Sequence, residues 1–145
     1  MPVAMSHANC IACGIVALGL LVASPLASAD VVAVVSSKST VTTLSKSQVL
    51  DIFLGKTARF PDGSQAEPID QSEGTIVRDE FHSKLAGKSA AQMKAYWSKI
   101  IFTGRGQPPK ALPNSADVKK RLVENPTAIG YIDSNMVDAS LRVVY

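Results

Sequence analysis

The sequence predicts an α/β fold, a mixed sheet with helices packed on its faces. Short segments rich in β-branched residues alternate along the chain with longer segments of helical periodicity. No Cys occurs after residue 29, so this part must be held together by a packed core rather than by disulfides. Residues 30–145 suffice for one ordinary domain and are too few for two, and they contain no repeat or internal linker.

The expected strands are short and apolar. Residues 31–35 form a β-branched run with almost no polar interruption, which is typical of a buried strand. Three further strands are expected at residues 66–69, 128–132 and 141–144. Helices are expected between them, so the strands should share one sheet that the helices cover.

Capping patterns and periodicity predict four helices. The first begins near Ser45, which pairs with Gln48 in a capping box, and Gly55 ends it. Ser89 and Gln92 repeat the capping box at the start of another helix, whose Tyr96 and Trp97 are expected in the core. A third helix is expected to begin at residues 74–75, and a fourth to span residues 115–124. A turn is expected at residues 60–63 and a Gly/Pro-rich loop at residues 103–109.

The N-terminal segment predicts export. Residues 11–22 are apolar or small throughout, and they are too few to cross a bilayer core of about 30 Å as a helix. Ala27-Ser28-Ala29 supplies the small-x-small pattern that signal peptidase requires. We therefore expect a signal peptide over residues 1–29, cleaved after Ala29, and a periplasmic protein beginning at Asp30. The alternative is a buried N-terminal helix.

Composition argues against several classes of site. The formal net charge is +3, and the single cationic run, at residues 119–121, is typical of a solvated helix face, so nucleic-acid binding is not expected. Cys10 and Cys13 would be removed with the signal peptide, which leaves no thiolate site, and we expect no cofactor. His82 is the sole His after residue 29 and has no cluster of possible ligands around it in the sequence, so no metal site is expected. No segment after the signal peptide is apolar enough to span a membrane.

One polar stretch, residues 70–75, has the pattern of an anion site. It lies between an expected strand and the N-terminus of an expected helix, where unpaired N–H groups and the helix dipole favour negative charge. Ser72 and Thr75 offer hydroxyl donors, and Gly74 lets an oxyanion approach the backbone. Arg78 follows within one turn and can supply a guanidinium.

Two other interpretations compete with this one. Asp70 as N-cap and Glu73 three residues later would form a capping-box-like pair that satisfies the same N–H donors internally. Ser72, His82 and Asp79 would be the members of a hydrolase triad, but the sequence around Ser72 does not resemble a nucleophile elbow. We therefore expect a binding protein and not an enzyme.

The order of elements resembles the second lobe of phosphate ABC-transporter substrate-binding proteins. Residues 44–56, Leu-Ser-Lys-Ser-Gln-Val-Leu-Asp-Ile-Phe-Leu-Gly-Lys, are similar to that family's L-T-x-x-Q-L-x-x-I-F-x-G-K segment. Residues 72–75 and 78–81 resemble its G-S-G-T phosphate loop and the R-D-x-F helix that follows, and residues 128–132 resemble its G-A-I-G-Y strand. The resemblance implies a single periplasmic-binding-protein-like lobe over residues 30–145.

The resemblance also implies a ligand and its contacts. Phosphate or a related oxyanion would be held by Ser72, Gly74 and Thr75. Glu73 stands where the family usually has Ser, and Asp70 occupies the region where it commonly has Arg. A carboxylate about 5 Å from a phosphate charge costs about 3 kcal/mol at an effective dielectric near 20.

A lone lobe implies weak binding unless something covers it. Small-ligand sites normally bury about 70–90% of the ligand, and one lobe leaves much of a phosphate in water. The facing wall would come from a second copy in a homodimer or from a membrane transporter or signalling protein. Arg105, in the loop over residues 103–109, is a secondary candidate contact, although a plain surface connection is the other interpretation. An alternative function is a degenerate lobe that serves as an interaction or sensory module.

Overall fold

The computed structural model describes residues 30–145. The predicted signal peptide, its cleavage site, Cys10 and Cys13 lie outside or at the boundary of the described residues. Within residues 30–145, none of the helices has the length and apolar character needed to cross a membrane.

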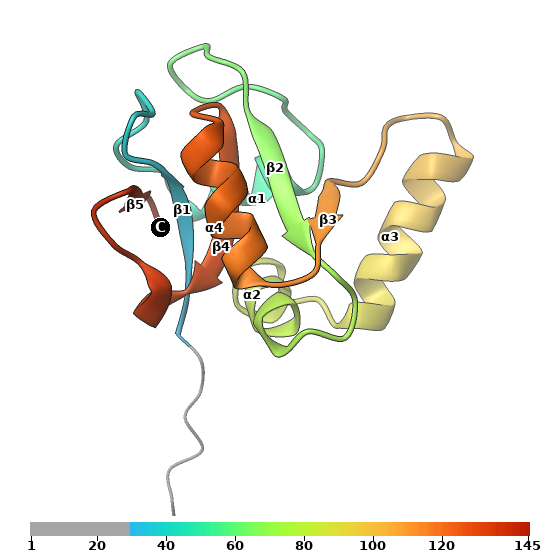
Figure 1. Cartoon of the computed structure of the whole chain (residues 1–145). Helices are drawn as coiled ribbons and strands as arrows, with labels where there is room; N and C mark the ends of the chain where they lie inside the picture. Colours follow the sequence, from blue (N-terminus) through green and yellow to red (C-terminus); the bar gives the residue numbers. More distant parts are fainter. Residues whose placement is uncertain (1–29) are drawn as a thin grey trace, which may run out of the picture.

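Five strands form one mixed sheet, which confirms the predicted fold class (Figure 1). Their order across the sheet is β3-β2-β4-β1-β5. β2 pairs in parallel with β3 and β4, whereas β1 pairs antiparallel with β4 and β5. The strands are β1 Val31–Ser36, β2 Glu67–Gln71, β3 Lys110–Leu112, β4 Ala128–Asp133 and β5 Leu141–Val143.

Four α-helices and one short 3₁₀-helix connect the strands. All four predicted helices are present, as are both capping boxes, at Ser45 and at Ser89. The helices are α1 Lys46–Phe53, α2 Ile76–Ala86, α3 Ala90–Phe102, α4 Ser115–Glu124 and η1 Ser134–Met136.

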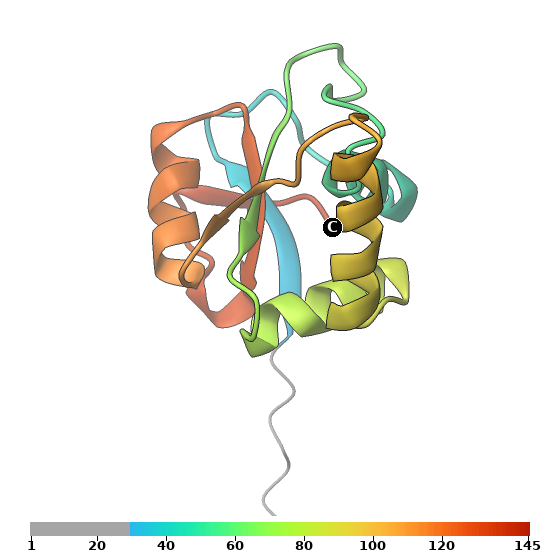
Figure 2. The same cartoon turned by 90° about the vertical axis from the view of Figure 1, so that its right-hand side faces the viewer.

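The two faces of the sheet carry separate cores. Alternate residues of β1 point to opposite sides, as the period of two in a strand requires. Ala33 and Val35 pack with α1 and α2 on one face, and Val34 packs with α4 on the other. Figure 2, which turns the sheet edge-on, shows α4 alone on one side and α1 and α2 on the other.

Gly130 in β4 sets how closely α4 approaches the sheet. A Cβ at this position would lie 2.7 Å from Val118 Cγ1, closer than atoms in proteins pack. The predicted Ala-Ile-Gly-Tyr strand therefore needs Gly for packing against α4, independently of any ligand.

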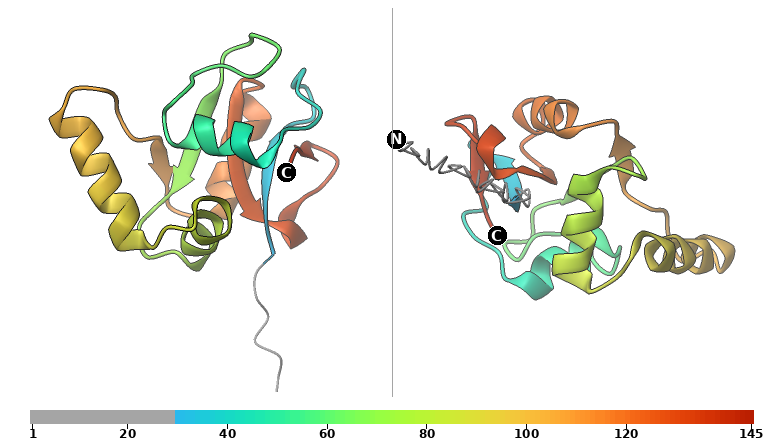
Figure 3. Two further views of the ribbon diagram at one scale, coloured as in Figure 1. Left: turned by 180° about the vertical axis from the view of Figure 1, so that it is seen from behind. Right: turned by 90° about the horizontal axis from the view of Figure 1, so that it is seen from below.

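α3 does not pack on a face of the sheet. It lies beyond the β3 edge, on the side of α1 and α2 (Figure 1, Figure 3). Met93 and Trp97 are buried against Leu54 at the end of α1, and the Tyr96 hydroxyl donates to the Leu54 carbonyl at 2.7 Å. The prediction that Trp97 belongs to the core is confirmed, whereas Tyr96 is half-buried.

The sheet differs from the sequence-based expectation in one additional strand and in the end of β2. β3 was not predicted, because it has only three residues, is largely exposed and has no alternating pattern. β2 ends at Gln71 rather than at Ile69, since the parallel pairing with β3 continues through Asp70 and Gln71. This extension removes Asp70 from the loop before α2 and places it in the sheet.

Candidate functional site

The end of β2 buries two polar side chains, Asp70 on the side of α2 and Gln71 on the side of the α4 N-terminus. The Gln71 amide donates to Ser115 Oγ and to the Tyr131 carbonyl, each at 3.0 Å. The backbone N–H of Gln71 donates to the Tyr131 hydroxyl oxygen at 3.0 Å. The Tyr131 hydroxyl in turn donates a short hydrogen bond to Asp70 Oδ1. Strands β2 and β4 are thus joined by a buried polar network.

Asp70 is the centre of this network, and two side chains of α2 point to it. Arg78 Nε lies 3.4 Å from Asp70 Oδ2, and His82 Nε2 lies 3.4 Å from Asp70 Oδ1. Asp70, Arg78 and His82 are each at most 6% exposed. We refer to Asp70, Arg78, His82 and Tyr131 as the Asp70 cluster.

The Asp70 cluster holds its carboxylate in the ionised form. Burial alone would raise the pKa of Asp70, but interactions with His82, Tyr131 and Arg78 outweigh it and lower the pKa below the ordinary 3.8. Burial and the Asp70 charge raise the pKa of Tyr131, so its hydroxyl remains a proton donor. The cluster is therefore an ion pair with hydrogen bonds on both carboxylate oxygens.

The capping alternative for Asp70 and Glu73 is wrong in this structure. The N-cap of α2 is Thr75, and no side chain caps it. Asp70 is instead bound within the Asp70 cluster. The first helical bond runs from Asp79 N to the Thr75 carbonyl, so the N–H groups of Ile76, Val77 and Arg78 precede it.

The predicted loop residues meet in one tight turn before α2. Gly74 has a φ of +86°, a conformation that favours Gly, and the space around its Cα is open. The Thr75 hydroxyl donates to the Ser72 carbonyl at 3.0 Å, and the Ser72 hydroxyl points to the Leu112 carbonyl at 3.4 Å. The two hydroxyls therefore fix the turn, and the donors left at the surface are backbone N–H groups.

Arg78 has an unused donor. Its Nε is directed to Asp70, but among residues 30–145 no hydrogen-bond partner reaches the buried Nη1. Buried guanidinium nitrogens are normally hydrogen-bonded, because each unsatisfied donor costs about 1–3 kcal/mol. Water or an external acceptor must satisfy such a donor, so Nη1 is a candidate contact for a ligand.

Arg78 lines a cavity of about 280 Å³ between the β2 end and α3. Glu73 lies at the same cavity and is exposed. Across the cavity stand Lys94, Trp97, Ser98 and Ile101, which share one face of α3 because they follow at spacings of three and four. The remaining lining residues are Asp70, Gln71, Pro108, Pro109 and Ala111.

The predicted site residues therefore lie in three places: at the cavity beside Arg78, in the adjoining turn and at a different cavity. It brings Glu73 and Arg78 to one cavity and sets Ser72, Gly74 and Thr75 in the adjoining turn. Arg105 lines a different cavity, with Lys56 and Tyr96, so it is not gathered with Arg78. Lys94 and the α3 face were not found from the sequence, since only the fold shows that α3 stands opposite the end of β2.

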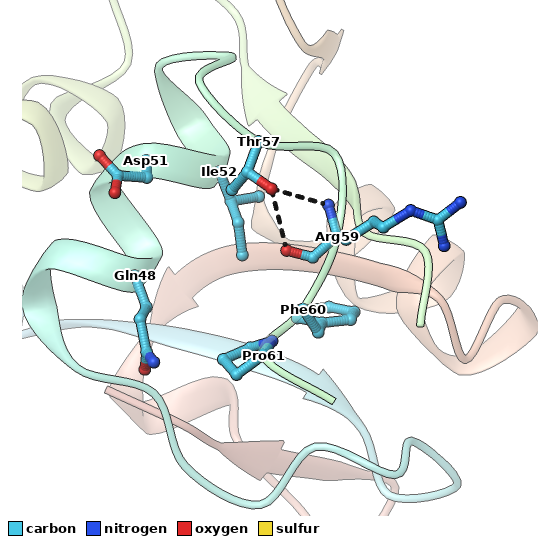
Figure 4. A pocket seen from close by; sticks show the side chains of 7 residues that line it. All are labelled: Gln48, Asp51, Ile52, Thr57, Arg59, Phe60 and Pro61. Carbon is cyan, nitrogen blue, oxygen red and sulfur yellow. Dashed lines mark hydrogen bonds between the residues drawn. The ribbon is translucent and has the colours of Figure 1, made fainter. Parts of the chain in front are cut away.

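Another cavity, of about 270 Å³, lies between α1 and the turn at residues 60–63 (Figure 4). Its polar groups are engaged within the protein. Thr57 Oγ1 accepts from Arg59 N at 3.2 Å, and Arg59 Nη1 donates to the Gly63 carbonyl at 2.8 Å. Figure 4 shows the Arg59 guanidinium directed away from Phe60 and Pro61, and Asp51 pairs with Lys56 at 3.6 Å.

The geometry does not form the hydrolase triad. His82 Nε2 faces Asp70, and Asp79 is exposed on α2. Ser72 Oγ points to the Leu112 carbonyl. Within residues 30–145, no group of three His, Cys, Asp or Glu side chains gathers in the way that a metal ion requires.

No known protein family's sequence model and no curated protein matches this chain. Solved structures do resemble it. A phosphate ABC transporter substrate-binding protein with bound phosphate from Clostridium perfringens matches 79% of this chain with a TM-score of 0.60 and 21% identity. An ABC-type phosphate transport receptor from Vibrio cholerae matches 79% with a TM-score of 0.61 and 16% identity, and PstS from Borrelia burgdorferi matches 79% with 0.59 and 12%.

The matched region is under half of each of those proteins. It covers 43% of the Clostridium protein, 44% of the Vibrio receptor and 46% of the Borrelia protein. This chain thus has the fold of one part of such a protein, as the predicted single lobe requires. At such low identities the structural likeness shows the fold alone, and the ligand has to be argued from the site.

Proposed function

We propose that this protein is an exported solute-binding lobe that binds phosphate or a related oxyanion at the N-terminus of α2. The observation that carries the proposal is Arg78, 6% exposed, with Nη1 free of any protein partner in the described region and with a cavity beside it. Gly74 and the first-turn N–H groups supply further donors, while Ser72 and Thr75 shape the turn.

The ion pair with Asp70 orients Arg78 for this role. A guanidinium has five N–H donors in a rigid fork, so a carboxylate on Nε fixes the direction of the others. Asp70 also cancels much of the Arg78 charge. Binding would therefore depend on charge-assisted hydrogen bonds, each contributing about 1.5–3 kcal/mol, together with about 0.3–1 kcal/mol from the helix dipole.

The open cavity predicts weak affinity in the isolated protein. The end of β2, α3 and the segment that follows α3 line the site, and its remaining side faces solvent. A bound phosphate would keep part of its hydration, and each 1.4 kcal/mol of missing contact weakens binding about tenfold. Tight binding would require a second copy of this chain or another protein, such as a membrane transporter, to supply the facing wall.

The phosphate-binding neighbours support a binding role rather than a catalytic one.

Export with cleavage after Ala29 belongs to the same proposal. Expression of the full sequence, followed by mass determination of the secreted protein, tests it directly. A secreted species beginning at Asp30 is expected, and retention of the first 29 residues would contradict it.

Isothermal titration with phosphate and with sulfate tests the binding proposal. We expect saturable binding in the millimolar range, weakened at least about tenfold in Arg78→Lys, which keeps the charge and loses the fork. Arg105→Lys is the matched control, because Arg105 lies outside the cavity, and it should bind like the wild type. Absence of binding to either anion by folded wild-type protein would refute the proposal.

A further inference from the structure

The cavity beside Arg78 has a polar end and an apolar side. We infer that its preferred ligand is a phosphate monoester carrying a compact apolar group, rather than inorganic phosphate. This inference rests on the proposed function and specifies the ligand class of the same site.

The apolar side offers surface that a bare phosphate would not use. Ile101 is 48% exposed on the α3 face that looks into the cavity. Trp97 lines the cavity one turn earlier on the same face. Pro108, Pro109 and Ala111 line it from the loop and strand that follow α3. Five of the eleven residues that line the cavity are therefore apolar.

The size of the cavity supports the same ligand class. Its volume of about 280 Å³ lies just below the range of drug-sized ligand sites, about 300–1,000 Å³, so it suits a compact ligand. Such sites usually combine apolar walls with a few placed polar groups, as here. A tetrahedral phosphate on Arg78 Nη1 would occupy the polar end and leave the α3 wall uncovered.

The physical preference follows from desolvation. An inorganic phosphate loses water by lying against Ile101, Pro108 and Pro109, whose side chains offer it no hydrogen-bond donor. An apolar substituent gains by leaving water, in proportion to the area that it buries. Lys94, at the far side of the cavity, adds attraction for the anion, whereas exposed Glu73 repels it.

Trp97 provides the readout, because it is the sole tryptophan of the chain. The experiment titrates protein from expression of the full sequence with inorganic phosphate, phenyl phosphate and phenol. Trp97 fluorescence and isothermal titration are followed together. We expect phenyl phosphate to bind at least about tenfold more tightly than inorganic phosphate, and phenol to bind more weakly than phenyl phosphate.

Two neighbouring α3 residues give a matched pair of variants. Ile101→Ser removes part of the apolar wall and should bring the ratio of the two phosphate affinities towards one. Phe102→Ser removes a side chain that is 92% exposed and lines none of the cavities described above, so the wild-type ratio should persist. Both substitutions are at exposed positions, and circular dichroism verifies that each variant is folded.

Each outcome bears on a different claim. Equal affinity for phenyl phosphate and phosphate overturns the inference and leaves the oxyanion proposal standing. Binding of phenol as tightly as phenyl phosphate, with no binding of phosphate, overturns both. An Ile101→Ser variant that keeps the full preference for phenyl phosphate also overturns the inference, because the apolar wall would then have no part in it.

Discussion

The N-termini of α1 and α3 differ from that of α2. In α1 and α3 a Ser accepts the backbone N–H three residues later and a Gln returns the bond, so each helix satisfies its own first donors. At α2 the N-cap Thr75 makes no such bond, and its hydroxyl donates backwards to Ser72. The first N–H groups of α1 and α3 are thus satisfied by side chains of the same helix. Those of α2, the helix that contains Arg78, are not, and we call this N-terminus open.

This difference identifies the α2 N-terminus as a place where the fold is less stable than a capped helix would make it. A good N-cap contributes about 1 kcal/mol, and an unsatisfied guanidinium nitrogen costs about 1–3 kcal/mol. Both losses fall at one place, the turn between β2 and α2. In proteins most of the sequence favours the observed fold, and the positions that do not are often functional sites.

The largest expected effect is on the Asp70 cluster that supports the open terminus. Asp70→Ala leaves Arg78 buried without its carboxylate, and we expect the free energy of unfolding to fall by about 3–5 kcal/mol. Urea denaturation measures it. Asp51→Ala is the control, because Asp51 pairs with Lys56 at the surface and should change stability by less than about 0.5 kcal/mol. Equal effects of the two substitutions would contradict the buried ion pair.

The stabilisation by Asp70 should depend on pH. Since its pKa is lower in the folded protein than the ordinary 3.8, its contribution is complete above that value and is lost as the pH falls through the folded-state pKa. The stability difference between wild type and Asp70→Asn should therefore be constant near neutral pH and shrink below about pH 4. A difference that grows on acidification would show that the pKa is raised.

Cap substitutions compare the helices directly. Ser45→Ala and Ser89→Ala each remove a capping box and should lower the free energy of unfolding by about 1 kcal/mol. Thr75→Ala removes no cap from α2, so its effect should stay below about 0.5 kcal/mol. Thermal denaturation of the three variants is the measurement. An effect of Thr75→Ala as large as that of Ser45→Ala would mean that α2 is capped after all.

The last effect concerns Glu73, the carboxylate at the open terminus. Glu73→Ser should raise the affinity for phosphate by about threefold to tenfold, because an exposed charge about 5 Å away is worth about 1 kcal/mol in water. The gain should shrink as salt is added. Glu124→Ser, at the end of α4, is the control for net charge. An equal gain in phosphate affinity for Glu124→Ser would show that the effect comes from net charge and not from the position of Glu73.

The sequence predicted the helices well because their signals are local. Ser45 with Gln48 and Ser89 with Gln92 specify two helix starts within four residues, and both are present. The mixed sheet followed from alternating strands and helices. β3 was missed because Lys110–Leu112 becomes a strand only by pairing with β2, which is a long-range contact that local pattern does not contain.

The site was predicted in part for the same reason. The turn at residues 72–75 and Arg78 are close in sequence, so their proximity could be expected. The role of Asp70 was misread, because its partners Tyr131 and His82 are 61 and 12 residues away. The α3 wall with Lys94 and Ile101 depends on where α3 lies in space.

The most direct test of the account is a phosphate titration followed by amide NMR on the isotope-labelled protein. If the open N-terminus of α2 binds the anion, the amide resonances of Gly74, Ile76 and Val77 should shift together and saturate with one affinity. The N-terminal amides of α1 and α3, closed by their own caps, should stay in place. Shifts of equal size at all three helix starts, or saturation with the α2 amides unmoved, would contradict it.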